Sequence, residues 1–132
     1  MADPTDVLSR FLFQTNHFSR AENRAFPDAF MPPPDLQLST FFTTGMPPIE
    51  IWQIGRHALA SHPRPRLYGH ADIDVGSIHS QKLKAFRDDD PDRHVNVMGW
   101  PSYSDGKDLI KSIAQELARG SRLVLLPTPI AK

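Results

Sequence analysis

Residues 67–75, LYGHADIDV, decide the fold because apolar and polar side chains alternate along them. Successive side chains of a β-strand point to opposite faces of the sheet. One face of this predicted strand would hold three apolar side chains, Ala71, Ile73 and Val75. The other face would hold three polar side chains, His70, Asp72 and Asp74. The pattern predicts a sheet with one face covered by helices and the other at least partly open.

Weaker signals predict further strands at residues 36–42, 82–87 and 93–99, and a short buried strand at 123–126. Thirteen prolines, about twice the usual 5% share, stiffen the connections between these segments. Residues 15–35 show no period. They are expected to form an irregular, aromatic-rich arm that inserts its phenylalanines into the core.

Apolar residues at helical spacing predict three helices. The first would begin at the capping residue Thr5 and bury four side chains, Val7, Leu8, Phe11 and Leu12. The second would begin at residues 47–48, where proline is tolerated, and end before Pro63. The third, capped by Ser104 or Asp105, would end with Gly120 in a left-handed conformation. Its buried stripe would comprise Leu109, Ile110, Ile113, Ala114 and Leu117.

Together these segments predict one α+β domain over residues 1–132. The expected architecture is a two-layer sandwich with a mixed sheet of four to five strands and about three helices. Fifteen basic residues balance fifteen acidic ones, which argues against a general binder of nucleic acid or of a membrane surface. The sequence lacks a run long enough to span a bilayer and a signal-peptide pattern, so we expect a cytoplasmic protein.

The chain contains no cysteine, which excludes disulfides and thiolate metal ligands. It also lacks the common sequence motifs of nucleotide-binding proteins, zinc proteases, α/β-hydrolases and EF-hands. Any active site must therefore be found from polar residues that share a face, and the cofactor cannot be named from the sequence.

The first candidate site combines the polar face of residues 67–75 with His94 and Asn96, which share a face of the strand at 93–99. If the two strands are close in the sheet, five side chains would converge: His70, Asp72, Asp74, His94 and Asn96. Imidazoles and carboxylates can bind Mn²⁺, Fe²⁺ or Zn²⁺, or act as general acid and base. The alternative is an ordinary solvated sheet face.

The second candidate site is the basic stretch at residues 56–66, which contains no carboxylate. Its members are Arg56, His57, His62, Arg64 and Arg66. Guanidinium groups bind phosphate or carboxylate, whereas a plain solvated helix end would also explain the charges. Trp100, at a predicted strand end, could stack a ligand beside this stretch or pack in the core. The acidic residues 88–92 favour either a solvated loop or a cation contact.

Several short phrases resemble a group of small bacterial proteins of uncharacterised function. They are His17–Phe18, AFMPP at 29–33, LSTF at 38–41, IWQIG at 51–55 and HVNVMGWP at 94–101. The resemblance covers roughly residues 17–120. It implies a bacterial origin and a free-standing domain, and it brings no catalytic residues.

Three functions remain open from the sequence. The first is a small accessory domain that binds a protein partner or forms a homo-oligomer. The second is a small metal- or histidine-dependent hydrolase, of the phosphodiesterase or nuclease type, that uses the His/Asp face. A third is a nucleotide-binding module built on Trp100 and residues 56–66.

Overall fold

The computed structural model describes residues 3–132 and contains one six-stranded sheet in the order β6-β7-β4-β1-β5-β8. All neighbouring strands are antiparallel. In chain order the strands are β1 (Val7–Leu12), β4 (Leu38–Phe42), β5 (Arg66–Asp74), β6 (Lys84–Arg87), β7 (His94–Met98) and β8 (Arg122–Ala131). Two short strands, β2 (Phe18–Ser19) and β3 (Arg24–Ala25), pair separately.

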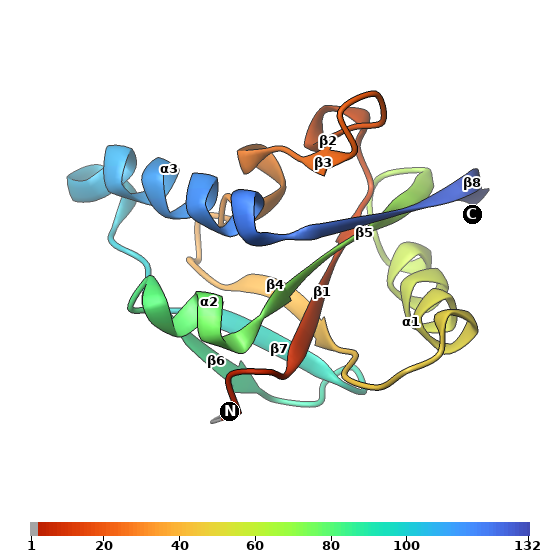
Figure 1. Cartoon of the computed structure of the whole chain (residues 1–132), viewed down its shortest axis with the longest axis horizontal. Helices are drawn as coiled ribbons and strands as arrows, with labels where there is room; N and C mark the ends of the chain where they lie inside the picture. The colour runs from red at the N-terminus through yellow and green to blue at the C-terminus, as the bar shows by residue number, and fades with distance from the viewer. Residues whose placement is uncertain (1–2) are drawn as a thin grey trace.

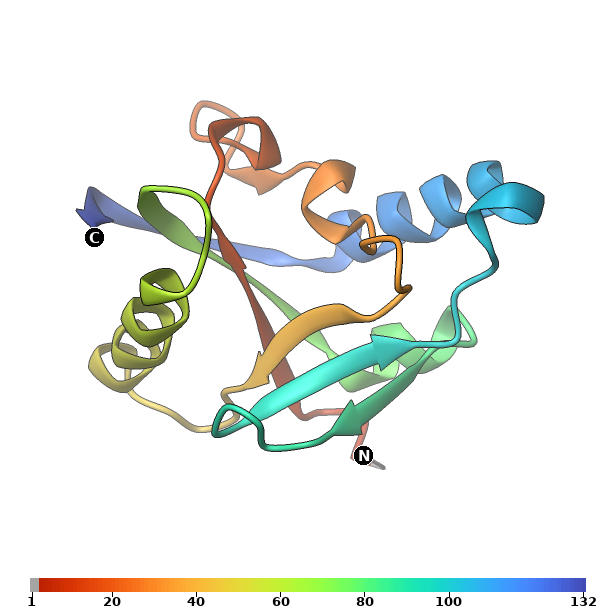
Figure 2. The same cartoon turned by 180° about the vertical axis from the view of Figure 1, so that it is seen from behind.

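Helices lie on both sides of the six-stranded sheet (Figures 1 and 2). They are α1 (Pro48–Ala60), α2 (Val75–Ser80) and α3 (Tyr103–Gly120), with the short 3-10 helices η1 (Thr15–His17) and η2 (Pro27–Phe30). The larger apolar core lies under α2, α3 and the arm, and a smaller core lies under α1. The α+β class is confirmed, but the sheet has more strands than predicted and is antiparallel rather than mixed. The predicted two-layer sandwich with one open face is wrong, because helices and an apolar core lie on both faces of the sheet.

The predicted first helix is wrong, because residues 7–12 form β1, an inner strand of the sheet. Leu8 and Leu12 enter the larger core, whereas Phe11 enters the smaller one. A strand buried on both faces does not alternate apolar with polar residues, so its pattern resembles helical spacing.

The strand at residues 67–75 is confirmed as β5, and Ala71 and Ile73 point into the larger core as predicted. Its pairing with β8 slips between Leu67 and Gly69, where four residues of β8 lie opposite Tyr68. That bulge contains Pro127 and Pro129, which cannot donate to a ladder and are tolerated on an edge strand. β8 is thus a long, largely exposed edge rather than a short buried strand.

The last helix is confirmed with three corrections. Its N-cap is Ser102, whose side chain accepts a hydrogen bond from the Asp105 amide. Leu109 is 56% exposed and does not belong to the buried stripe, whose other four predicted members are buried. Gly120 closes the helix without a left-handed conformation.

The arm at residues 15–35 is irregular, as expected, and its Phe18 and Phe30 are buried in the larger core. Phe26 remains partly exposed. Within residues 3–132, no helix combines the length and apolar character that crossing a membrane requires.

Candidate functional site

The polar side chains of β5 and β7 lie on the α1 side of the sheet but do not converge. Two strands, β4 and β1, separate them, so the axes of β5 and β7 are roughly 14 Å apart. The phenylalanine rings of Phe41 and Phe11 lie between them, with centroids 5.6 Å apart. Phe41 packs edge-on against His94, and Phe11 packs edge-on against His70. The predicted five-residue site is therefore split into two clusters.

The first cluster surrounds Asp72 on β5. One oxygen of this carboxylate accepts hydrogen bonds from Ser9 Oγ and from His70 Nδ1, both at 2.6 Å. Ser9 also bonds Thr43 Oγ1 at 2.8 Å, and the ring of Trp52 covers His70. His70 is buried, and the cluster ties β5 to β1 and α1. Asp74 lies apart from it, near the strand end, and pairs with Arg122.

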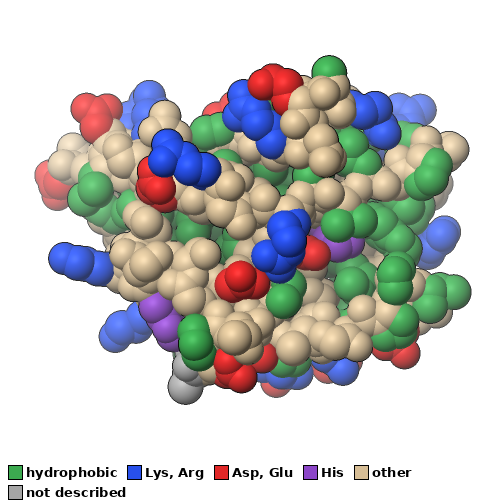
Figure 3. Space-filling view, in the orientation of Figure 1, with side chains coloured by type: hydrophobic (Ala, Val, Ile, Leu, Met, Phe, Trp, Pro, Cys, Tyr) green, Lys and Arg blue, Asp and Glu red, His purple; other side chains and the backbone are tan. Residues whose placement is uncertain are grey.

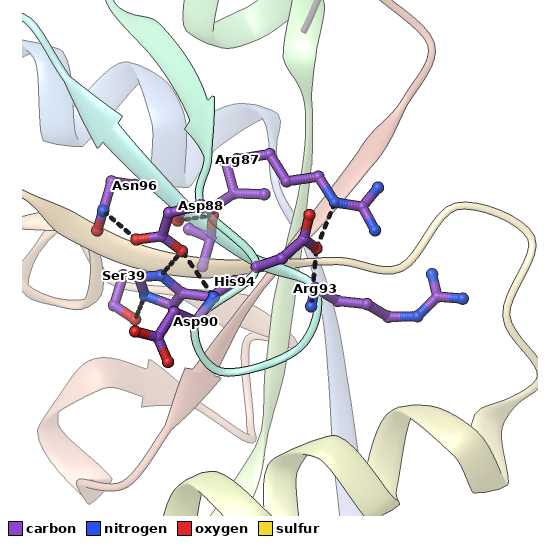
Figure 4. A network of polar contacts seen from close by, with 10 residues as sticks. Ser39, Arg87, Asp88, Asp90, Arg93, His94 and Asn96 are labelled. Carbon is purple, nitrogen blue, oxygen red and sulfur yellow. Dashed lines mark hydrogen bonds and ion pairs between the residues drawn. The ribbon is translucent and has the colours of Figure 1, made fainter.

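The second cluster links a serine, a histidine and an aspartate in a row (Figure 4). Ser39 Oγ lies 2.7 Å from His94 Nε2, and His94 Nδ1 lies 2.8 Å from Asp88 Oδ1. Asn96 Nδ2 donates to the other oxygen of Asp88 at 3.0 Å. The predicted residues His94 and Asn96 thus belong to one cluster. Its other two members, Ser39 and Asp88, were not predicted as site residues.

Strand pairing explains why these side chains meet. Ser39 on β4 is opposite Asn96 on β7, so His94 is its diagonal neighbour and its ring can reach the hydroxyl. Asp88 follows β6 at the start of the β6–β7 loop, and its amide donates to the carbonyl of His94. The loop backbone is held by Asp89, whose carboxylate binds Arg87 and the Arg93 amide.

The protonation pattern of this cluster follows from its hydrogen bonds. The Asp90 amide and the His94 ring both donate to Asp88, and they lower the pKa of this carboxyl group below its usual value. An ionised Asp88 only accepts, so His94 must carry a proton on Nδ1. In the neutral imidazole Nε2 is then a bare acceptor, and the Ser39 hydroxyl donates to it. This is the arrangement in which a histidine can remove a serine proton.

A cavity of about 320 Å³ opens beside Ser39 and His94, and we call it the Arg10 cavity. Its lining also includes Arg10, His62 and the three rings of Phe11, Phe13 and Phe41. It therefore brings a serine hydroxyl, a partly buried cation and apolar walls together in one space. Such a combination is typical of small-ligand sites.

Arg10 reaches this cavity through a gap in the sheet. β1 pairs with β4 at only two positions, Leu8 with Phe42 and Ser9 with Phe41. Beyond them the strands diverge, and the guanidinium of Arg10 fills the space. Its Nε donates to the Ala29 carbonyl at 2.9 Å and its Nη1 to the Ser39 carbonyl at 3.0 Å. Side-chain hydrogen bonds thus replace part of the missing ladder.

His62 forms another wall of the Arg10 cavity. Its ring stacks on Phe13 with centroids 3.9 Å apart, and its Nδ1 accepts the Arg64 amide at 3.0 Å. The neutral ring therefore carries its proton on Nε2. Burial, together with the positive charge of Arg10, lowers the pKa of His62, which favours this neutral form at neutral pH.

The remaining predicted ligand residues lie elsewhere. Three of them, Arg56, Arg64 and Arg66, are exposed, and His57 lines a neighbouring cavity of about 510 Å³. Trp100 is only 6% exposed, donates to the Val97 carbonyl and packs in the larger core. It is therefore a core residue on the other side of the sheet, which separates it from residues 56–66.

One sequence expectation needs revision. Among residues 3–132, no group of three or more His, Asp and Glu side chains has the geometry to hold a metal ion. The metal-dependent version of the hydrolase therefore lacks a ligand set, whereas the histidine-dependent version has one histidine in place. Sequence reasoning missed Ser39, Asp88 and Arg10. Only Asp88 had a local signal, the acidic run at 88–92.

Comparison with models of known protein families, with curated proteins and with solved structures finds no match. The geometry of the Ser39 cluster and of the Arg10 cavity is therefore the basis for the function proposed below.

Proposed function

We propose that the protein is a small serine hydrolase that cleaves esters through Ser39, with His94 as general base and Asp88 as its orienting carboxylate. The observation that carries the proposal is the continuous relay from Ser39 Oγ to His94 to Asp88, with links of 2.7 and 2.8 Å, beside the Arg10 cavity. A nucleophile in hydrogen-bond contact with a base, and a base held by a third group, are the required geometry.

The reaction would proceed in two halves. Ser39 Oγ forms a bond to the carbonyl carbon of an ester while its proton passes to His94 Nε2. The same proton then goes to the leaving alcohol as the ester C–O bond breaks, which leaves an acyl group on Ser39. A water molecule then gives a proton to His94 while its oxygen bonds to the acyl carbon. The bond between this carbon and Ser39 Oγ breaks as His94 returns the proton to Oγ, and the carboxylic acid leaves.

Asn96 acts as a positioning residue in this scheme. Its amide donates to the Asp88 oxygen that His94 does not use, so the carboxylate cannot rotate away from the ring. The Asp90 amide adds a further hydrogen bond to Asp88 at 3.1 Å. Such fixed partners keep the base in the tautomer and orientation that proton removal requires.

A fluorophosphonate probe tests this proposal without a known substrate, because it reacts with an activated serine and releases fluoride. We expect one adduct on the wild-type protein, located at Ser39 by peptide mass spectrometry. The adduct should be absent from Ser39→Ala and much slower to form in His94→Gln. Ser61 lines the same cavity but donates to a backbone carbonyl and has no histidine partner, so Ser61→Ala is the matched control.

Labelling that is absent at Ser39, or that proceeds equally fast in urea-unfolded protein, would contradict the proposed activity. The unfolded sample matters because relay-dependent reactivity must disappear when β4 and β7 separate.

A second candidate function, a protein-interaction domain, is favoured by apolar side chains that gather over α1 and the end of β8 (Figure 3). Ile49 on α1 is 69% exposed. We would test this candidate by sedimentation of the wild type and of Ile49→Asp. A monomer in both cases, together with no recovered partner, would count against it.

A further inference from the structure

The guanidinium of Arg10 is the feature that the proposed relay does not use. Six ion pairs are formed among residues 3–132, and none includes Arg10. Its hydrogen bonds go to two backbone carbonyls, through Nε and Nη1. Nη2 makes no hydrogen bond, and no fully buried side-chain nitrogen or oxygen in this part of the chain lacks a partner. Nη2 is therefore not fully buried, and Arg10 is one of the residues that line the cavity.

The charge on Arg10 is costly where it lies. Burial lowers the pKa of Arg10 to about 10, so the side chain is still protonated at neutral pH but has lost much of its hydration. A partly buried cation without a carboxylate partner gains more from an anion than a fully exposed one does, because water screens the exposed charge.

The cavity walls suit a ligand with a flat apolar part. Phe11, Phe13 and Phe41 line it, and His62 offers an N–H on Nε2 as a further donor. Aromatic walls with a small number of polar groups orient a ligand through its charged end.

The local charges also limit the ligand's own charge. Arg10 supplies one positive charge. Asp88 carries a negative charge and binds the nitrogen of the His94 ring that does not contact Ser39. A ligand with one negative charge balances Arg10, and among the described residues that line this cavity no other lysine or arginine is present to balance a second charge.

We propose that the Arg10 cavity binds a monoanionic oxyanion, a carboxylate or a phosphodiester, that carries an aromatic group. Arg10 Nη1 lies 3.0 Å from the carbonyl of Ser39, and both residues line the same cavity, so an anion bound by Arg10 there lies beside Ser39. Binding of the anion does not depend on the proposed function. Only the step that makes this anion part of a substrate rests on it. Arg10 is then the specificity-determining residue.

The test uses the Ser39→Ala protein, which can bind but not cleave, and NMR titration with four simple probes. Benzoate and methyl phenyl phosphate are the monoanions, benzamide is the neutral analogue, and phenyl phosphate adds a second charge. We expect at least one monoanion to bind about tenfold or more tightly than benzamide, because a hydrogen bond to a charged group is lost. Phenyl phosphate should bind more weakly than methyl phenyl phosphate.

The two monoanions distinguish a carboxylate site from a phosphodiester site. The Arg10→Met variant should abolish the preference over benzamide, whereas Arg64→Met, which removes an exposed arginine near His62, should retain it. If Arg10→Met does not fold, the comparison of the monoanions with benzamide on the Ser39→Ala protein, in which Arg10 is intact, still tests the anion site.

Equal affinity for benzamide and both monoanions, or no binding by any of the probes, would overturn the anion site. Fluorophosphonate labelling of Ser39 without anion preference would overturn this inference and leave the hydrolase standing. A preference for the anions without labelling of Ser39 would support the anion site and overturn the proposed hydrolase.

Discussion

Replacement of Asp88 by asparagine tests the relay most informatively, because it removes the charge and nearly preserves the shape. Asp88 accepts from His94 Nδ1 at 2.8 Å, and the carboxylate stabilises the imidazolium that forms when Ser39 loses its proton. An asparagine oxygen in the same place would still accept this bond but would carry no charge. We therefore expect slower reaction of Ser39 with a fluorophosphonate in Asp88→Asn.

The size of the effect follows from exposure. In serine proteases, loss of the buried aspartate lowers kcat about 10⁴-fold. Here the side chain of Asp88 is 30% exposed and that of His94 is 12% exposed, so water screens part of the interaction. We expect the second-order rate constant of labelling to fall about 10²- to 10³-fold, within the usual range for general-base catalysis.

The assay is time-resolved mass spectrometry of labelling at pH 7.5, with circular dichroism to confirm folding. Asp89→Asn is the control, because the Asp89 side chain binds Arg87 and the Arg93 amide. Asp89 contacts His94 only through its backbone amide, which the substitution keeps. Its labelling rate should stay near the wild-type rate. A rate in folded Asp88→Asn within about threefold of wild type would refute a general-base role for the relay.

Three predictions concern stability, and urea unfolding measures each. Leu117→Ala should lower the free energy of unfolding by about 2–5 kcal/mol, whereas exposed Leu109→Ala should change it by less than about 0.5 kcal/mol; similar values would contradict the corrected stripe. Gly69→Ala would place Cβ 2.3 Å from the Val124 carbonyl oxygen, so it should cost about 3 kcal/mol, and an unchanged midpoint would count against the β5–β8 pairing. Burial lowers the pKa of His17 and His62, so the unfolded chain binds more protons than the folded protein below pH 6.5. The free energy of unfolding should therefore fall from pH 7.5 to pH 5.5. An equal or higher free energy of unfolding at pH 5.5 would refute this prediction.

The strands that could be predicted are those with one polar face. β5 and β7 alternate clearly, and Ile73 and Val95 are both fully buried as the pattern requires. β1 could not be predicted in this way, because its Leu8 and Phe11 enter cores on opposite faces of the sheet. Local periodicity does not report which segment becomes an inner strand. Long-range packing decides that.

The candidate site was partly predictable for the same reason. Alternation placed His94 and Asn96 on one face, but strand order decides which partners they meet. The order β7-β4-β1-β5 puts Ser39 beside His94 and leaves two strands between His94 and His70. Arg10 had no sequence signal at all, because its position depends on the gap between β1 and β4.

The tautomer of His94 is the most direct test of the account. Two-bond ¹H–¹⁵N correlation spectra of the histidine rings at pH 7.5 distinguish a proton on Nδ1 from a proton on Nε2. In the proposed relay His94 donates to Asp88 through Nδ1 and accepts from Ser39 at Nε2, so we predict the proton on Nδ1. A His94 ring protonated on Nε2 could not accept the serine proton, and that spectrum would contradict the proposed activation of Ser39.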